Sequence, residues 1–159
     1  MWSTLIAVLG TLAGTALATL TQRATDHAAR TERHRQDVTA ALLALLETVL
    51  RYREHYWLTV ARRRAGESEA PDQVAARYRL RTEVTVARDR LALIARGTVL
   101  VGLGETAAWA AVELDDIPLG TATDGQFDPA TEDALATGRD RARDAHTALR
   151  KAGSTYLTR

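Results

Sequence analysis

Prolines are scarce along this chain, and their scarcity limits the folds that it can adopt. The first of its three prolines stands at position 71, and the others are Pro118 and Pro129. Hydrophobic residues make up 46% of the sequence but aromatic residues only 5%, so alanine, leucine and valine supply most of the apolar surface. Alanine and leucine favour helix over strand. The sequence therefore predicts an all-α protein with long helices.

An apolar segment opens the chain, because residues 2–22 carry no charged side chain before Arg23. As a helix it would span about 31 Å at ~1.5 Å per residue, which matches the ~30 Å hydrocarbon core of a bilayer. The threonine, serine and glycine residues in it reduce the gain from its leucines. We expect a single N-terminal transmembrane helix over residues 1–22. The alternatives are a cleaved signal peptide, with Ala16-Leu17-Ala18 as its small-residue site, and a soluble amphipathic arm.

The residues that flank this segment predict its orientation. Arginines follow it closely, whereas no lysine or arginine precedes it. Positive charge is retained on the cytoplasmic side and indole rings favour the membrane interface. We therefore expect Arg23, Arg30 and Arg33 at the inner interface and Trp2 at the outer one. This predicts a single-pass protein of the cell membrane with a cytoplasmic C-terminal body.

Small residues recur at every fourth position of the same segment, at Gly10, Gly14 and Ala18. On a helix they share one face, along which two backbones can approach closely. We expect this face to support helix packing in the membrane and hence a homo-oligomer. The alternative is that glycine and alanine are simply common in membrane helices.

The rest of the chain divides into a polar stretch and a patterned body. Residues 23–37 are almost entirely polar and predict a solvated helical stalk. Residues 38–159 are expected to form one helical domain. The first helix of this domain carries a core-facing stripe with alternating steps of four and three residues: Val38, Leu42, Leu45, Val49, Tyr52, Tyr56 and Val60. The AGESEA segment at 65–70 predicts the turn that follows it.

Two further helices have clear start signals. One begins at Pro71 and runs to about residue 96, since proline suits the first turn of a helix. The other begins at Pro129, where Asp128 can cap it. The expected core-facing residues are Leu80, Val84, Ala87, Leu91 and Ile94 on the first, and Leu135, Ala142, Ala145, Leu149, Ala152 and Tyr156 on the second.

The stretch between these two helices is harder to interpret. Residues 97–113 contain three glycines, which weaken a helix. We expect Thr98–Val101 to be a short extended piece, followed by a helix over 105–114 and an acidic loop over 115–128. The overall prediction is a membrane helix that continues into an antiparallel helical hairpin or a three- to four-helix bundle.

No residue pattern indicates catalysis. Cysteine is absent, which excludes disulfides and thiolate chemistry. Residues 102–107 match the G-x-G-x-x-A form of the dinucleotide fingerprint, but no sheet is predicted to hold that turn, and a close helix-to-helix join is the simpler interpretation. His27 and His34 lie about 10 Å apart along a helix, too far for one zinc ion. The acidic loop lacks calcium-site spacing and fits a solvated loop or a partner for the protein's own arginines. We expect no enzymatic activity, no cofactor and no metal.

Arginine runs raise the question of nucleic acid. Arg62, Arg63 and Arg64 end the first long helix and are candidate polyanion contacts, and further arginines lie between residues 77 and 90. Acidic residues are interspersed among them, however, and the net charge is only +1. Phosphate attraction requires a positive field. A solvated, ion-paired helix surface is the simpler interpretation, while direct contact with nucleic acid stays open.

The order of these segments resembles a known family. An MWSTLIAVLGTLAGTALATLTQRA opening, a polar arginine-rich stalk, a VTAALLALLETVLRYREHYW helix and an AARYRLRTEVTVARDRLAL helix follow one another. This arrangement resembles the KilB-like plasmid-spread proteins of actinomycete mobile elements. The resemblance implies membrane association and a part in spreading conjugative DNA. It brings no catalytic or binding residues with it.

Together these observations predict a membrane-anchored, self-associating helical interaction protein. It would assist the spread or transfer of a conjugative plasmid or integrative element, with conjugative transfer proteins among its partners. The alternative from a different class is a soluble or peripheral helical protein that binds nucleic acid.

Overall fold

The computed structural model describes the backbone of residues 2–158 and the side chains of residues 22–23 and 25–158. Its elements are α1 (Trp2–Arg64), α2 (Pro71–Ile94), α3 (Val99–Val112), the short 3-10 helix η1 (Glu113–Asp116) and α4 (Pro129–Leu157). No strand occurs among these described residues. The all-α prediction is therefore confirmed. The chain divides into two compact units, Met1–Asp37 and Val38–Arg159.

The transmembrane prediction does not stand. In the part of the chain that the structure describes, no helix combines the length and the apolar character needed to cross a membrane. On this finding the predicted transmembrane helix over residues 1–22 is wrong, and so is the single-pass location at the cell membrane that was inferred from it. The physical weakness of the prediction is visible in the sequence. Six hydroxyl side chains dilute the leucines, and each reduces the gain from transfer into hydrocarbon: Ser3, Thr4, Thr11, Thr15, Thr19 and Thr21.

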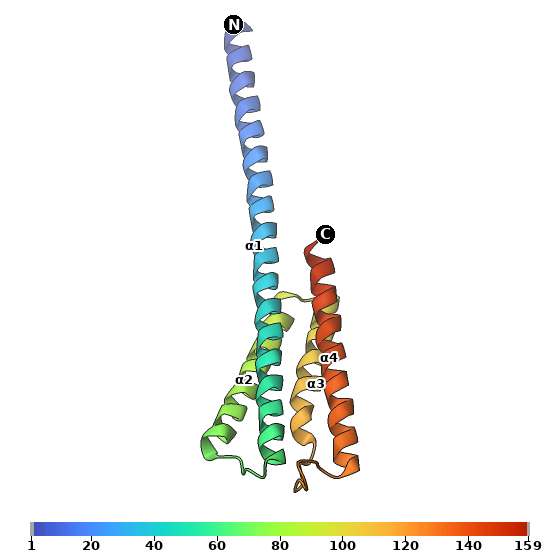
Figure 1. Cartoon of the computed structure of the whole chain (residues 1–159). Coiled ribbons are helices and arrows are strands. Elements are labelled where there is room, and N and C mark those ends of the chain that lie inside the picture. Colours follow the sequence, from blue (N-terminus) through green and yellow to red (C-terminus); the bar gives the residue numbers. More distant parts are fainter. Residues whose placement is uncertain (1, 159) are drawn as a thin grey trace. The chain divides into compact units, whose positions relative to one another are not determined.

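The second unit is a bundle of antiparallel neighbours. The C-terminal part of α1 packs with α2, α3 and α4, and the chain direction alternates from each helix to the next (Figure 1). Residues 65–70 join α1 to α2, residues 95–98 join α2 to α3, and η1 with residues 117–128 leads into α4. Short connections of this kind favour antiparallel packing of successive helices.

The core of this bundle consists of the stripes that the sequence predicts. All seven stripe residues of α1 are buried, with exposed fractions of 0–4%. On α2 the buried residues are Val84, Ala87 and Leu91, while Leu80 and Ile94 pack partly buried against the core. On α4, Leu135, Ala142 and Leu149 are buried. These parts of the fold prediction are confirmed.

The segment before α3 differs from its prediction. Thr98 is extended, with φ −101° and ψ 157°, but it is the N-cap and the helix begins at Val99. The predicted extended piece over Thr98–Val101 is therefore wrong. Packing explains the difference, since Leu100 is fully buried and Gly104 lies against Leu91 and Leu45. Burial of a helix face outweighs the low helix propensity of glycine.

The start of α4 follows its prediction closely. The Asp128 carboxylate accepts hydrogen bonds from the amides of Ala130 and Thr131, both at 3.1 Å, and from the Thr131 hydroxyl at 2.6 Å. These bonds lower the pKa of the Asp128 carboxyl, and the bond from the Thr131 hydroxyl has the largest effect. The cap therefore satisfies amides that a helix N-terminus leaves without partners.

Candidate interaction surface

The α2 helix is apolar on two opposite sides. Val84, Ala87 and Leu91 face the core, whereas Tyr78, Val86 and Leu93 are 61–64% exposed. The exposed three are spaced by eight and seven residues, so they lie along one face of the helix. At ~1.5 Å per residue this face is about 22 Å long. We call it the α2 outer face. Single exposed apolar side chains are ordinary on a protein surface, and their alignment along one helix face makes this row a candidate interaction site.

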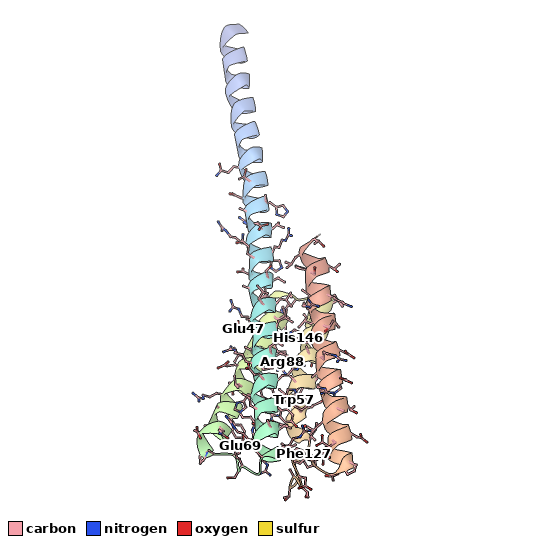
Figure 2. The ribbon with its side chains drawn as sticks, viewed as in Figure 1. Glu47, Trp57, Glu69, Arg88, Phe127 and His146 are labelled. Atoms are coloured by element: carbon pink, nitrogen blue, oxygen red, sulfur yellow. The ribbon has the colours of Figure 1, made fainter. Side chains whose placement is uncertain are left out.

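A second exposed row runs along α1. Leu43, Leu50 and Leu58 are 59%, 48% and 50% exposed, and we call this the α1 outer face. The two rows are neighbours, because Arg51 of α1 pairs with Glu83 of α2 at 3.2 Å. Arg51 also lies 3.9 Å from Glu47 of its own helix, which Figure 2 labels.

The two faces carry opposite charge. Between the leucines of α1 stand Glu47 and Glu54, and Glu54 forms no ion pair within the described part of the chain. The α2 helix carries exposed arginines, and two that lie beside the α2 outer face have no ion-pair partner among the described residues: Arg79 and Arg90. An apolar strip with acidic groups therefore lies beside an apolar strip with basic groups, which is an arrangement that favours pairing with a complementary surface.

An exposed aromatic side chain lies beyond α2, on α3. Trp109 is 44% exposed, and the Arg88 guanidinium lies 5.5 Å from its ring centroid. Arg88 also pairs with Asp89 at 2.7 Å. Tryptophan and arginine are the residues most often found to dominate binding energy at interfaces.

The arginine run at the end of α1 is largely engaged within the protein. Arg63 donates to the Leu119 carbonyl at 3.2 Å. Arg64 pairs with Glu132 at 2.5 Å, and its guanidinium lies 5.7 Å from the Phe127 ring centroid. All three arginines, Arg62 included, are half-buried rather than fully exposed. The structure brings them to one end of the bundle but does not present them as an open basic patch, and polyanion contact by this run stays a prediction.

The other predicted residues lie in the first unit. Arg23, Arg30 and Arg33 are exposed on α1. Trp2, Gly10, Gly14 and Ala18 lie outside the residues whose side chains the structure describes, so the predicted packing face stays untested. One prediction from the charge pattern, that acidic residues find partners among the protein's own arginines, is confirmed. Acidic residues of the loop region pair with the protein's own arginines, as Glu113 does with Arg141 at 2.8 Å.

Sequence reasoning missed the α2 outer face. The available signal was the row of Tyr78, Val86 and Leu93, which falls about half a turn away from the core-facing stripe. It was obscured because this side of the helix also carries Arg79 and Arg90, which suggested a merely solvated surface.

A comparison with known protein families shows to which family the chain belongs. A model of the KilB plasmid transfer protein family matches residues 39–157, which is most of the chain and nearly all of the second unit. The chain belongs to this family. The predicted resemblance is thereby confirmed, and a role of this KilB-family protein in plasmid transfer follows at that general level. No curated protein and no solved structure matches the chain.

Proposed function

We propose that this KilB-family protein is a non-catalytic helical interaction protein that self-associates through its α1 and α2 outer faces and so builds part of a plasmid transfer apparatus. The observation that carries the proposal is the pair of adjacent apolar rows, whose six side chains are 48–64% exposed. The partner that we assign is a second copy of the chain.

Charge complementarity supports a second copy as the partner. If two bundles meet about a two-fold axis, the acidic α1 outer face of each copy lies on the basic α2 outer face of the other. Both contacts then form at once, as a closed isologous interface requires. Glu54 and Arg79, which lack ion-pair partners within the described chain, gain oppositely charged neighbours in such a dimer.

Analytical ultracentrifugation of the full-length chain tests this proposal. Val86→Glu places a negative charge in the middle of the α2 outer face, opposite the acidic α1 outer face of the second copy, at a side chain that is 61% exposed and whose loss leaves the core intact. We expect dimerisation to weaken about tenfold or more, equivalent to ~1.4 kcal/mol. Ala148→Glu, at an exposed position of α4, is the matched control and should associate as the wild type does.

Two results would contradict the proposal. One is a wild-type chain that stays monomeric at all concentrations reached. The other is a Val86→Glu variant that associates as strongly as the wild type, because self-association would then use another surface.

Nucleic-acid binding remains the competing function and receives less support. Arg63 and Arg64 contact the protein's own carbonyl and carboxylate groups, so few free cations remain at the end of α1. Retention of duplex DNA that falls steeply with salt, with the same affinity in Val86→Glu and Ala148→Glu, would favour this function over self-association.

A further inference from the structure

A hollow of ≈ 210 Å³ lies between α2 and α3. Arg81, Thr85 and Arg88 line it from α2, and Trp109 lines it from α3. The other lining residues are valine and alanine. Figure 2 labels Arg88 on the bundle. Because Arg81, Thr85 and Arg88 are spaced by four and three residues, they share one face of α2, and none of them belongs to the α2 outer face.

The polar lining of this hollow is basic. Among the described residues no carboxylate lines it. The guanidinium of Arg81 is exposed and has no ion-pair or hydrogen-bond partner in the described part of the chain. A hollow lined by one sign of charge concentrates the field and attracts ions of the opposite sign. The expected ligand is therefore an anion.

The donors that an anion needs are present and accessible. Arg88 donates to Asp89 through Nε at 2.9 Å and Nη2 at 2.7 Å, so its Nη1 is left for another acceptor, and its side chain is 24% exposed. The Thr85 hydroxyl donates to the Arg81 carbonyl at 3.0 Å. The two guanidinium groups are therefore the donors that remain for a ligand.

The indole of Trp109 forms the border of the hollow. It is 44% exposed, and the Arg88 guanidinium lies 5.5 Å from its ring centroid. The same indole borders a second hollow, which Glu105 and Glu113 line on the α4 side. An anion is repelled by those carboxylates and attracted by the arginines. A ligand that lies on the indole is thus oriented with its charged end toward α2.

Phosphate fits the two arginines better than carboxylate does. A phosphate monoester carries a charge of about −1.5 to −2 and three acceptor oxygens at neutral pH, so both guanidinium groups can bind it at once. A carboxylate has two oxygens and is commonly filled by a single arginine. The volume of the hollow lies below the ~300 Å³ at which cavities for whole drug-sized ligands begin. It therefore suits one end of a ligand, with the remainder outside on the exposed ring.

We propose that this hollow binds the phosphate group of a small aromatic phosphate ester, such as a nucleoside monophosphate, whose ring lies on the exposed part of the Trp109 indole. The guanidinium groups of Arg81 and Arg88 donate to the phosphate oxygens. Aromatic side chains stack with any of the nucleobases, so the ring contact does not select one base. The site goes beyond self-association and does not depend on it.

Adenosine monophosphate is the probe, and binding to the full-length chain is measured by calorimetric titration. Three comparisons each change one part of it: adenosine lacks the phosphate, inorganic phosphate lacks the ring, and benzoate carries a carboxylate on a flat ring. We expect adenosine monophosphate to bind more tightly than all three. In NMR spectra the Trp109 indole N–H signal, assigned by its loss in Trp109→Phe, should shift on binding while that of Trp57 stays unchanged.

The decisive variant is Arg81→Gln, which removes a charge that has no partner in the described chain. We expect it to weaken binding of adenosine monophosphate about tenfold without lowering the melting temperature of the free chain. The matched control is Arg79→Gln, the same change at an exposed, unpaired arginine of α2 that does not line the hollow. It should bind the probe as the wild type does.

Four results would overturn the proposal: no binding of adenosine monophosphate, equally tight binding of any of the three comparison compounds, equal affinities in Arg81→Gln and Arg79→Gln, or an unshifted Trp109 signal. Binding of a single-stranded oligonucleotide without a terminal phosphate, in place of the mononucleotide, would also overturn it and would favour the competing nucleic-acid function. Sedimentation of the same two variants shows separately whether they dimerise, so failure of this site and failure of the dimer are distinguishable.

Discussion

Tyr52 and Tyr56 occupy the same buried stripe of α1, yet their hydroxyls have different surroundings. The Tyr52 hydroxyl donates to Asp115, 63 residues further along the chain, while the Tyr56 hydroxyl is buried without a hydrogen-bond partner among the described residues. The period of the sequence predicts that both rings turn toward the core. It does not reveal which segment lies opposite, so the Tyr52–Asp115 bond was not foreseeable from α1 alone.

His146 of α4 is a residue at which pH should act. Burial lowers its pKa, and the nearby charge of Arg53 adds to that effect. Between the lowered pKa and the ordinary value of 6.5, the unfolded chain binds a proton that the folded chain does not. Stability therefore falls as pH drops below this ordinary value and recovers as pH rises.

The corresponding measurement is urea unfolding between about pH 7.5 and pH 5, a range centred on the ordinary histidine titration. We expect the wild type to lose stability at the acidic end and His146→Gln to lose less. An equal acid dependence in both proteins would show that His146 does not carry the effect.

At the scale of elements, two helical glycines provide a matched test of close packing. A methyl group on Gly153 of α4 would overlap the buried side chain of Leu42 on α1, whereas one on Gly102 of α3 would meet open space. We expect Gly153→Ala to destabilise the fold by about 1–3 kcal/mol through overpacking. Gly102→Ala should stabilise it by about 0.5–1 kcal/mol through helix propensity.

Denaturant unfolding measured by circular dichroism distinguishes these effects. Equal changes in the two variants, in either direction, would indicate that α1 and α4 do not pack as closely at Gly153 as the structure has them.

The elements themselves illustrate which predictions local sequence supports. The stripe of α1 and the cap of α4 depend on residues within a few turns of one another, and both are confirmed. The start of α3 depends on what packs against it, since Leu100 and Gly104 are held by residues of other helices. Glycine content alone therefore led to an extended piece where the chain is helical.

At the scale of the whole molecule, self-association should couple to stability. If only the folded chain dimerises, dilution shifts the balance toward unfolding, so the melting temperature falls as the protein concentration is lowered. Differential scanning calorimetry over a hundredfold range of concentration checks this. Val86→Glu should show a smaller dependence of the melting temperature on concentration, while a wild-type melting temperature independent of concentration would argue against the dimer.

The whole-molecule predictions differed in how much of the sequence supported them, and this difference explains which were confirmed. The all-α class and the KilB family depend on patterns spread over the whole body and are confirmed. The transmembrane prediction depended on one marginal segment and is wrong on the structural finding. A single segment close to a hydropathy threshold gives weak grounds for the location of an entire protein.

The two-sided character of α2 has a consequence for how the protein behaves before it assembles. With Leu91 turned inward and Leu93 turned outward, the helix is fully covered only when something lies on its second side. A chain too dilute to pair leaves this apolar side uncovered, so, if the proposed dimer forms, we expect proteases to remove the protein fastest when its concentration is lowest.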